Sequence, residues 1–162
     1  MKKSMLLFVV LALVISTSAQ NKKEVKISEK AKSGFAKVYP VATDVNWQKE
    51  GKSYEVEFKQ NGIATSVDID AEGTIMETES TIAKTDLPKG VEEFVAKNHK
   101  GWVITEAAKI VDAKGNITFE AQVSKDKMKK DLMFTKDGKP VVKKESKSEK
   151  EVKGEKEEDE KD

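Results

Sequence analysis

The chain has 162 residues, with 30 basic residues, all of them Lys, and 29 acidic residues, so its net charge is +1 at neutral pH. A nearly neutral chain has no overall field that would draw it to nucleic acid or to an anionic membrane. Without Arg it also lacks the planar fork that reads guanine, so nucleic-acid binding is not expected. The absence of Cys excludes disulfides, thiolate nucleophiles and Cys-based metal sites.

The N-terminus has the three parts of a cleavable signal peptide. Lys2 and Lys3 precede an apolar run from Met5 to Ile15, and small residues lead to Ala19. Eleven apolar residues make roughly 16 Å of helix, about half of a bilayer core, which argues against a membrane anchor. We therefore expect residues 1–19 to be a signal cleaved after about Ala19, and the mature chain to have no membrane span.

The remaining sequence divides into three zones. Residues 20–27 form a short Lys-rich lead-in, residues 28–145 carry periodic hydrophobicity, and residues 146–162 are almost entirely Lys, Glu, Asp and Ser. The last zone has a single apolar residue, Val152, and cannot bury enough surface to offset the entropy of ordering. It is predicted to be a disordered, solvated tail, with a tether or a weak metal-binding role as the alternative.

The first half of the middle zone predicts one helix and then four short antiparallel strands. Ser28 is a candidate N-cap and Pro40 ends the helix, whose apolar positions fall at i, i+4, i+7 and i+8: Ala31, Phe35, Val38 and Tyr39. Alternating apolar residues follow, and Asn61-Gly62 is a strong hairpin-turn signal. The alternating positions are Val45, Trp47, Tyr54, Val56, Phe58, Ile63, Val67, Ile69 and Ile75.

The second half repeats this order. Pro88 is expected in the first turn of a second helix and Gly101 is a candidate C-cap, with strands at 102–111, 117–123, 132–134 and 141–142. A constant shift of 65 superposes apolar positions of the two halves, including Tyr54 on Phe119 and Gly73 on Gly138. We therefore predict an α+β fold made of a tandem repeat, about 28–82 and 86–145, each with one helix plus a four-stranded antiparallel sheet.

These residues carry a resemblance to a known family. The order Tyr39-Pro40, Val45-x-Trp47, Tyr54-x-Val56-x-Phe58 and Val67-x-Ile69-Asp70-x-x-Gly73 resembles the PepSY-like family of small exported bacterial proteins, which are similar to beta-lactamase-inhibitor proteins. The resemblance covers residues 28–145. It implies a helix-plus-sheet repeat, a periplasmic or secreted location in a Gram-negative bacterium, and a binding or inhibitory role. The second half lacks the Tyr-Pro and the matching Trp.

One acidic segment comes close to the pattern of a calcium-binding loop. Asp68, Asp70 and Glu72 precede Gly73, and Glu79 follows at about the spacing of the last ligand. The Glu in place of a shorter ligand and the strand-like flanks favour a polar β-turn instead. Asp68, Asp70, Glu72 and Glu79 are therefore candidate metal ligands with a structural alternative.

Few other residues suggest a site. Trp47, Tyr54 and Trp102 are candidate binding residues because rigid aromatics often anchor protein interfaces, although Trp47 and Tyr54 could equally fill the core beneath a helix. His99, the one histidine, is expected at the end of the second helix. No catalytic constellation is recognisable, and no cofactor is expected.

The sequence therefore favours an exported, non-enzymatic binding protein that modulates or inhibits a peptidase or another envelope or secreted protein. The alternative is a periplasmic protein that binds calcium or a small ligand at residues 68–79. The oligomeric state is left open.

Overall fold

The structure is a computed structural model that describes residues 26–141. The signal peptide predicted for residues 1–19, nearly all of the lead-in and the tail from residue 146 lie outside the described residues, so these three assignments stay predictions. The described part contains two helices and one sheet, which confirms the α+β class.

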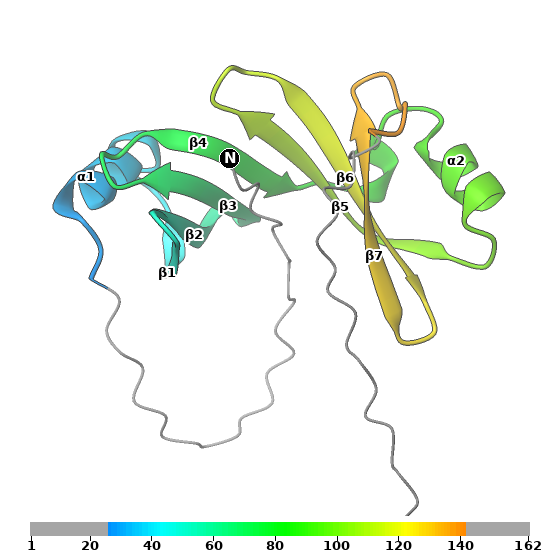
Figure 1. The fold of residues 1–162 in the computed structure, drawn as a ribbon, viewed down its shortest axis with the longest axis horizontal. Helices are drawn as coiled ribbons and strands as arrows, with labels where there is room; N and C mark the ends of the chain where they lie inside the picture. The colour runs from blue at the N-terminus through cyan, green and yellow to red at the C-terminus, as the bar shows by residue number, and fades with distance from the viewer. Residues whose placement is uncertain (1–25, 142–162) are drawn as a thin grey trace, which may run out of the picture.

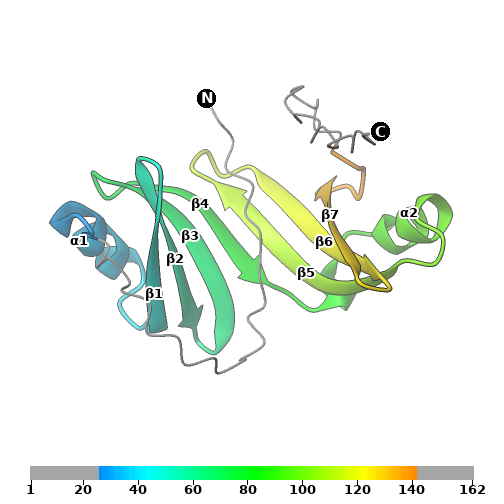
Figure 2. The same ribbon diagram turned by 60° about the horizontal axis from the view of Figure 1, so that its bottom comes forward.

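The seven strands form one antiparallel sheet in which each strand pairs with the next along the chain. Figure 2 shows this order running across the sheet from β1 to β7. The strands are β1 Thr43–Glu50, β2 Ser53–Gln60, β3 Ile63–Asp70, β4 Ile75–Thr81, β5 Val103–Asp112, β6 Ile117–Lys125 and β7 Met128–Thr135. The helices are α1 Glu29–Val38 and α2 Val91–Asn98, and a short 3₁₀ helix, η1 Lys84–Asp86, lies between β4 and α2. The two α-helices lie at opposite ends of the longest axis (Figure 1).

The first helix begins and ends where the sequence predicts. The Ser28 hydroxyl accepts a hydrogen bond from the Ala31 amide at 3.0 Å, which satisfies one of the amides left over at the helix start. The same hydroxyl donates to the Ala71 carbonyl at 2.6 Å, so the cap also ties α1 to the turn after β3. The helix ends at Val38, with Tyr39 as the C-cap directly before Pro40.

The second helix starts later than predicted. Pro88 lies before the helix instead of in its first turn, because Gly90 has a left-handed backbone with φ 94° and helical geometry begins only at Val91. His99, not Gly101, is the C-cap residue, and Gly101 lies in the turn beyond it. The position expected for the histidine, at the end of this helix, is confirmed.

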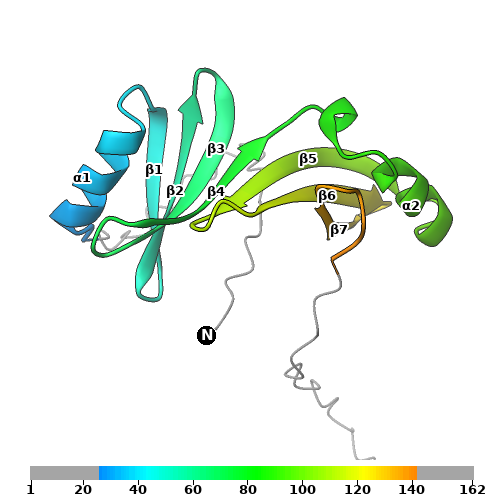
Figure 3. The ribbon, with the colours of Figure 1, turned by 90° about the horizontal axis from the view of Figure 1, so that it is seen from above.

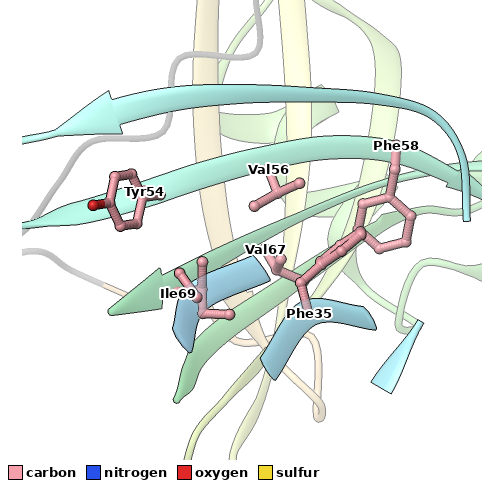
Figure 4. Close-up of a cluster of buried hydrophobic side chains, with 7 residues drawn as sticks. Phe35, Tyr54, Val56, Phe58, Val67 and Ile69 are labelled. Carbon is pink, nitrogen blue, oxygen red and sulfur yellow. The ribbon is translucent and has the colours of Figure 1, made fainter. Parts of the chain in front are cut away.

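The larger core lies between α1 and strands β2 and β3. Phe35 from the helix packs edge-on against Phe58 at 5.0 Å between ring centroids, and Trp47 packs against Phe35 from β1 at 5.5 Å. Figure 4 shows the strand side chains gathered around the helical Phe35. The buried members are Ala31, Phe35, Tyr54, Val56, Phe58, Val67 and Ile69. All of them are positions at which the helical and alternating patterns are apolar, but Val38, Val45 and Ile63 of the same patterns are exposed.

A smaller core joins α2 to strands β6 and β7. Val91, Ala121 and Phe134 are its fully buried members, and Phe94 packs edge-on against Phe134 at 5.5 Å. Adjacent residues across a sheet point to the same face, and the pairings Val67–Thr78, Thr78–Val111 and Ala107–Ala121 carry the helix-bearing face from β3 to β6. Both helices therefore cover the same face of the sheet, and the strand direction turns strongly between them (Figure 3).

Strand pairings recur between the two halves. Tyr54 pairs with Ile69 in the first half, and Phe119 pairs with Phe134 in the second, with every position shifted by 65. The second half differs at its end, because the expected strand at 141–142 is replaced in the described residues by a single bridge between Phe134 and Pro140. Pro140 has no amide hydrogen to extend a ladder, and residue 142 lies outside the described part.

The first helix and the β3–β4 turn touch through their backbones. A Cβ at Gly34 in α1 would lie 2.2 Å from the Gly73 carbonyl oxygen, and a Cβ at Gly73 would lie 2.4 Å from the Lys30 carbonyl oxygen. Gly73 also has φ 90°, which side chains rarely tolerate. Two glycines thus set the distance at which α1 covers the sheet.

We expect Gly34→Ala to lower the free energy of unfolding by about 1–3 kcal/mol, because the added methyl group forces the helix off the turn. Helix propensity alone predicts the opposite sign, a gain of about 1 kcal/mol for Gly to Ala. Urea unfolding measures the difference. Ser33→Ala, at an exposed position of the same helix, is the matched control and should have little effect; a stabilised Gly34→Ala variant would contradict the contact.

Candidate functional site

The face of the sheet opposite α1 and α2 carries the polar half of the alternating pattern. The pairings Glu55–Asp68, Ser66–Glu79 and Ala108–Glu120 place carboxylates from neighbouring strands on this face. We call it the acidic face, and its carboxylates include Glu50, Glu55, Glu57, Asp68, Glu77, Glu79, Glu106, Glu120 and Asp131. Neither described α-helix covers it.

Acidic residues stand directly opposite one another on this face. Asp68 on β3 lies between Glu55 on β2 and Glu77 on β4, an arrangement in which like charges repel. Lys129 Nζ forms an ion pair with Glu106 Oε1 on this face, at 3.7 Å. Because the chain as a whole is nearly neutral, the acidic face is a local segregation of charge.

Burial and mutual repulsion raise the pKa of three carboxyl groups. Burial, followed by repulsion from Glu50, Glu57 and Asp68, raises the pKa of Glu55 to about 7. Burial, followed by repulsion from Glu77 and Glu50, raises the pKa of Asp68 to about 6. Burial raises the pKa of Glu79 to about 8, with further contributions from Glu120, Glu77, Asp131 and Glu55. All three groups therefore gain or lose a proton near neutral pH.

Glu79 is the most buried of these groups, with 2% of its surface exposed. Its Oε2 atom has no hydrogen-bond partner within the described residues, and the same is true of the hydroxyl of Ser66, the residue paired with it on β3. Glu79 lines a small cavity of about 20 Å³ between β4, β5 and β6. We call this cavity the Glu79 pocket; its lining residues are Glu79, Thr81, Glu106, Ala107, Ala108 and Glu120.

The four candidate calcium ligands occupy different surroundings. Asp70 and Glu72 lie in the β3–β4 turn, where the Glu72 carboxylate is ion-paired with Lys30 of α1. Asp68 and Glu79 lie on the acidic face, on separate strands. Among residues 26–141, no group of three or more His, Asp or Glu side chains is arranged to hold a metal ion. The calcium hypothesis stays a prediction.

Asp70 has a clear structural role in its turn. Its Oδ1 atom accepts hydrogen bonds from the amides of Glu72 at 2.9 Å and Thr74 at 2.8 Å. Asp112 caps the β5–β6 turn in the same way, through the amides of Lys114 and Asn116. The repeated Asp-Ala-x-Gly sequence therefore encodes a hairpin turn whose first side chain satisfies the backbone.

The three candidate aromatic residues lie in different settings. Tyr54 is buried in the larger core and its hydroxyl accepts from the Ser28 amide at 3.3 Å, which is the core placement that the alternating pattern also allowed. Trp47 is half-buried against the same core. Trp102, also half-buried, lies beside His99 at 6.4 Å between ring centroids. The binding role of these aromatics stays a prediction.

Most of the acidic face was not predicted from the sequence. The signal was present, because acidic residues fill the gaps between apolar ones in segments such as Tyr54-Glu55-Val56-Glu57-Phe58. Such residues are normally solvated on the outer face of a sheet. Only the pairing of strands shows that Glu55, Asp68 and Glu77 come together, and only the packing shows that Glu79 is buried.

A second hollow, of about 520 Å³, follows the exposed side of α1. Its lining mixes lysines and glutamates, and Lys30 and Glu72 within it are already paired with each other. It offers a partner no net charge, unlike the acidic face. None of the helices in the described residues is long and apolar enough to cross a membrane.

Comparison with known proteins relates the chain to solved structures by fold. No family model matches it, and no curated protein matches its sequence. A BLIP-like protein from Bacteroides fragilis superposes with a TM-score of 0.61 at 22% identity, covering 81% of this chain and 94% of that one. A DUF2874 family protein from Bacteroides uniformis gives 0.64 at 20% identity, covering 72% and 88%.

A protein from Bacteroides eggerthii that is described as periplasmic gives a TM-score of 0.65 at 20% identity, covering 72% of this chain and 87% of that one. At these identities the likeness concerns the fold alone. The chain therefore has a BLIP-like fold, with seven antiparallel strands and two helices in its described residues.

The raised pKa values predict how stability depends on pH. Glu55, Asp68 and Glu79 have folded-state pKa values of about 7, about 6 and about 8, above the unfolded values near 4. The folded protein thus holds more protons than the unfolded chain between about pH 4 and pH 8. Its stability should fall as pH rises through this window, by up to about 1.4 kcal/mol per pH unit for each extra proton.

Thermal unfolding followed by circular dichroism should therefore give a higher midpoint at pH 5 than at pH 8.5. Glu79→Gln should raise the midpoint at pH 8.5 and flatten the profile, because it removes one buried charge. Glu92→Gln, on the exposed surface of α2, is the control and should leave the profile unchanged. A wild-type midpoint that rises from pH 5 to pH 8.5 would contradict the assignment.

The role of Asp70 gives a separate prediction. Asp70→Ala should lower the free energy of unfolding by about 1–2 kcal/mol, because two turn amides lose their acceptor. Asp137→Ala, at an exposed position in the turn after β7 that Thr135 caps, should cost much less. Repeating the melts with calcium tests the calcium hypothesis: a rise in the wild-type midpoint that Asp70→Ala abolishes would support it, and equal midpoints with and without calcium would count against it.

Proposed function

We propose that this chain is an exported, non-enzymatic binding protein that contacts another envelope or secreted protein through its acidic face and thereby modulates or inhibits it. The observation that carries the proposal is the acidic face itself. Neighbouring strands present carboxylates to one another there, and their pKa values are raised by burial and repulsion. This arrangement costs stability, and a positively charged partner surface would recover that cost.

The comparisons support this proposal at the level of fold. One structure of the same fold is a BLIP-like protein, and another is described as periplasmic. The predicted signal at residues 1–19 supports export to the periplasm or beyond. In this proposal the chain is PepSY-like, and its two helix-plus-strand units are a tandem repeat; the strand pairings that recur with a shift of 65 support this interpretation.

Two features favour binding over catalysis. The Glu79 pocket, at about 20 Å³, has room for a group the size of one water molecule and not for a substrate. His99, the one histidine, caps α2 and packs beside Phe94 and Trp102, away from the carboxylates of the acidic face. A raised carboxyl pKa is also a mark of active sites, but here it accompanies a broad charged surface.

Site-specific crosslinking tests the proposal. Because the chain contains no Cys, an introduced Cys is the one thiol that the label can modify. Thr118→Cys places a photoreactive label on the acidic face, and Glu93→Cys places the same label on the exposed side of α2. In envelope extract we expect the first label to crosslink a defined protein, with unlabelled wild-type chain competing for it.

The Glu57→Lys, Glu77→Lys variant is the matched competitor. It should compete at least tenfold less well, because it reverses two charges on the acidic face. The captured protein, once purified, should bind the wild-type chain in solution. Equal crosslinking from both labelled sites, or full competition by the charge-reversed variant, would rule out the acidic face as the contact surface.

A further inference from the structure

The Glu79 pocket lies near the middle of the acidic face. Glu79 comes from β4, Glu106 and Ala108 from β5, and Glu120 from β6, so three adjacent strands bring carboxylates to one small cavity. Its volume of about 20 Å³ is close to what one water-sized group needs. The pocket is thus a small hollow in a broad charged surface.

A buried, unpartnered atom gives the pocket a second and independent feature. Glu79 is 98% buried, and its Oε2 atom lacks a hydrogen-bond partner within the described residues. Leaving such an oxygen without a donor is costly, because it has given up its bonds to water. When Glu79 is ionised, the missing element is a hydrogen-bond donor, and the surrounding carboxylates favour one that is positively charged.

We infer that the Glu79 pocket receives a primary ammonium group, the Nζ atom of a lysine side chain that the partner protein presents. The inference rests on the proposed binding function and names the chemical group that anchors the partner. Glu79 is the principal acceptor. Glu120 and Glu106 supply further negative charge at the walls.

The size and geometry of the pocket favour an ammonium group over two other cations. An ammonium is a compact point charge with three donors, whereas guanidinium is a planar fork that needs more room. A divalent metal needs several oxygen ligands around one point, and the described residues contain no group of three carboxylates or histidines arranged in that way. A lysine side chain also brings a long apolar stem, which suits the Ala108 wall.

Binding of the ammonium is coupled to proton release. The charged groups around Glu79 are Glu77 on β4, Glu55 on β2, Glu120 on β6 and Asp131 on β7, with Glu106 and its partner Lys129 at the pocket wall. With a pKa of about 8, Glu79 holds a proton at pH 7 in the free protein. When a lysine enters, the carboxyl group gives this proton to solvent and the resulting carboxylate pairs with the ammonium.

The test uses calorimetry with an N-acetylated, C-amidated tetralysine peptide as the probe. We expect saturable binding whose affinity rises from pH 6 to pH 8.5, by at most about tenfold per pH unit below the pKa of Glu79. Titrations at pH 7 in two buffers of different ionisation enthalpy should show release of more than half a proton per peptide. A peptide with acetylated side chains should not bind, and a tetraarginine peptide should bind at least tenfold more weakly.

Variants then locate the binding. Glu79→Gln should weaken binding at least tenfold and reduce the pH dependence, while its melting curve verifies that it folds. The matched control is Glu92→Gln, which removes the same charge on α2, and it should bind like the wild type. Equal binding by Glu79→Gln, no pH dependence, or equal affinity for arginine and lysine peptides would overturn the inference, and so would calcium or magnesium binding that Glu79→Gln abolishes.

The two proposals can fail separately. If crosslinking identifies a partner on the acidic face but the lysine peptide does not bind, the ammonium pocket is wrong and the binding face stands. If the peptide binds as expected but crosslinking places the partner elsewhere, the proposed function is wrong and the pocket stands as a cation site.

Discussion

The structure depends on one constraint: a single seven-stranded sheet is covered by both of its helices on the same face. Most of the apolar half of β2, β3, β6 and β7 is buried beneath α1 or α2. On the other face, the polar side chains of neighbouring strands therefore lie beside one another, and neither described α-helix covers them. Antiparallel sheets commonly solvate such a face. Here carboxylates fill it at adjacent positions, and part of it, including Glu79 and Ser66, is buried.

This arrangement conflicts with stability and is therefore informative about function. Glu55, Asp68 and Glu79 resist ionisation because they are partly removed from water and face other carboxylates. The larger core, with its contacts among Phe35, Phe58 and Trp47, offsets such a cost. Proteins commonly retain unfavourable charge where a ligand or partner requires it. The close backbone contact between Gly34 and Gly73 holds α1 on the opposite face, so the acidic face stays uncovered on that side.

Sequence reasoning performed best where one local interaction decides the outcome. Ser28 caps α1, and alternating aromatic and aliphatic residues place β2 and β3 correctly, because each signal acts within a few residues. It was less accurate at α2, where the left-handed Gly90 delays the start of the helix. It also expected a strand at 141–142, where the described residues have one bridge at Pro140. The acidic turn resembles a calcium loop in sequence because Asp residues are common calcium ligands. In the structure the Asp70 carboxylate caps a hairpin turn.

The sequence by itself determined the class of fold and the two faces of each strand, because side-chain alternation along a strand is a local property. It also excluded chemistry that needs Cys or Arg. Only the tertiary structure decided which carboxylates face one another and which of them lose contact with water. Strand register places Asp68 between Glu55 and Glu77 and sets Glu79 beside Ser66. Pairing and burial join residues far apart in the chain, so no local pattern could reveal the pocket around Glu79.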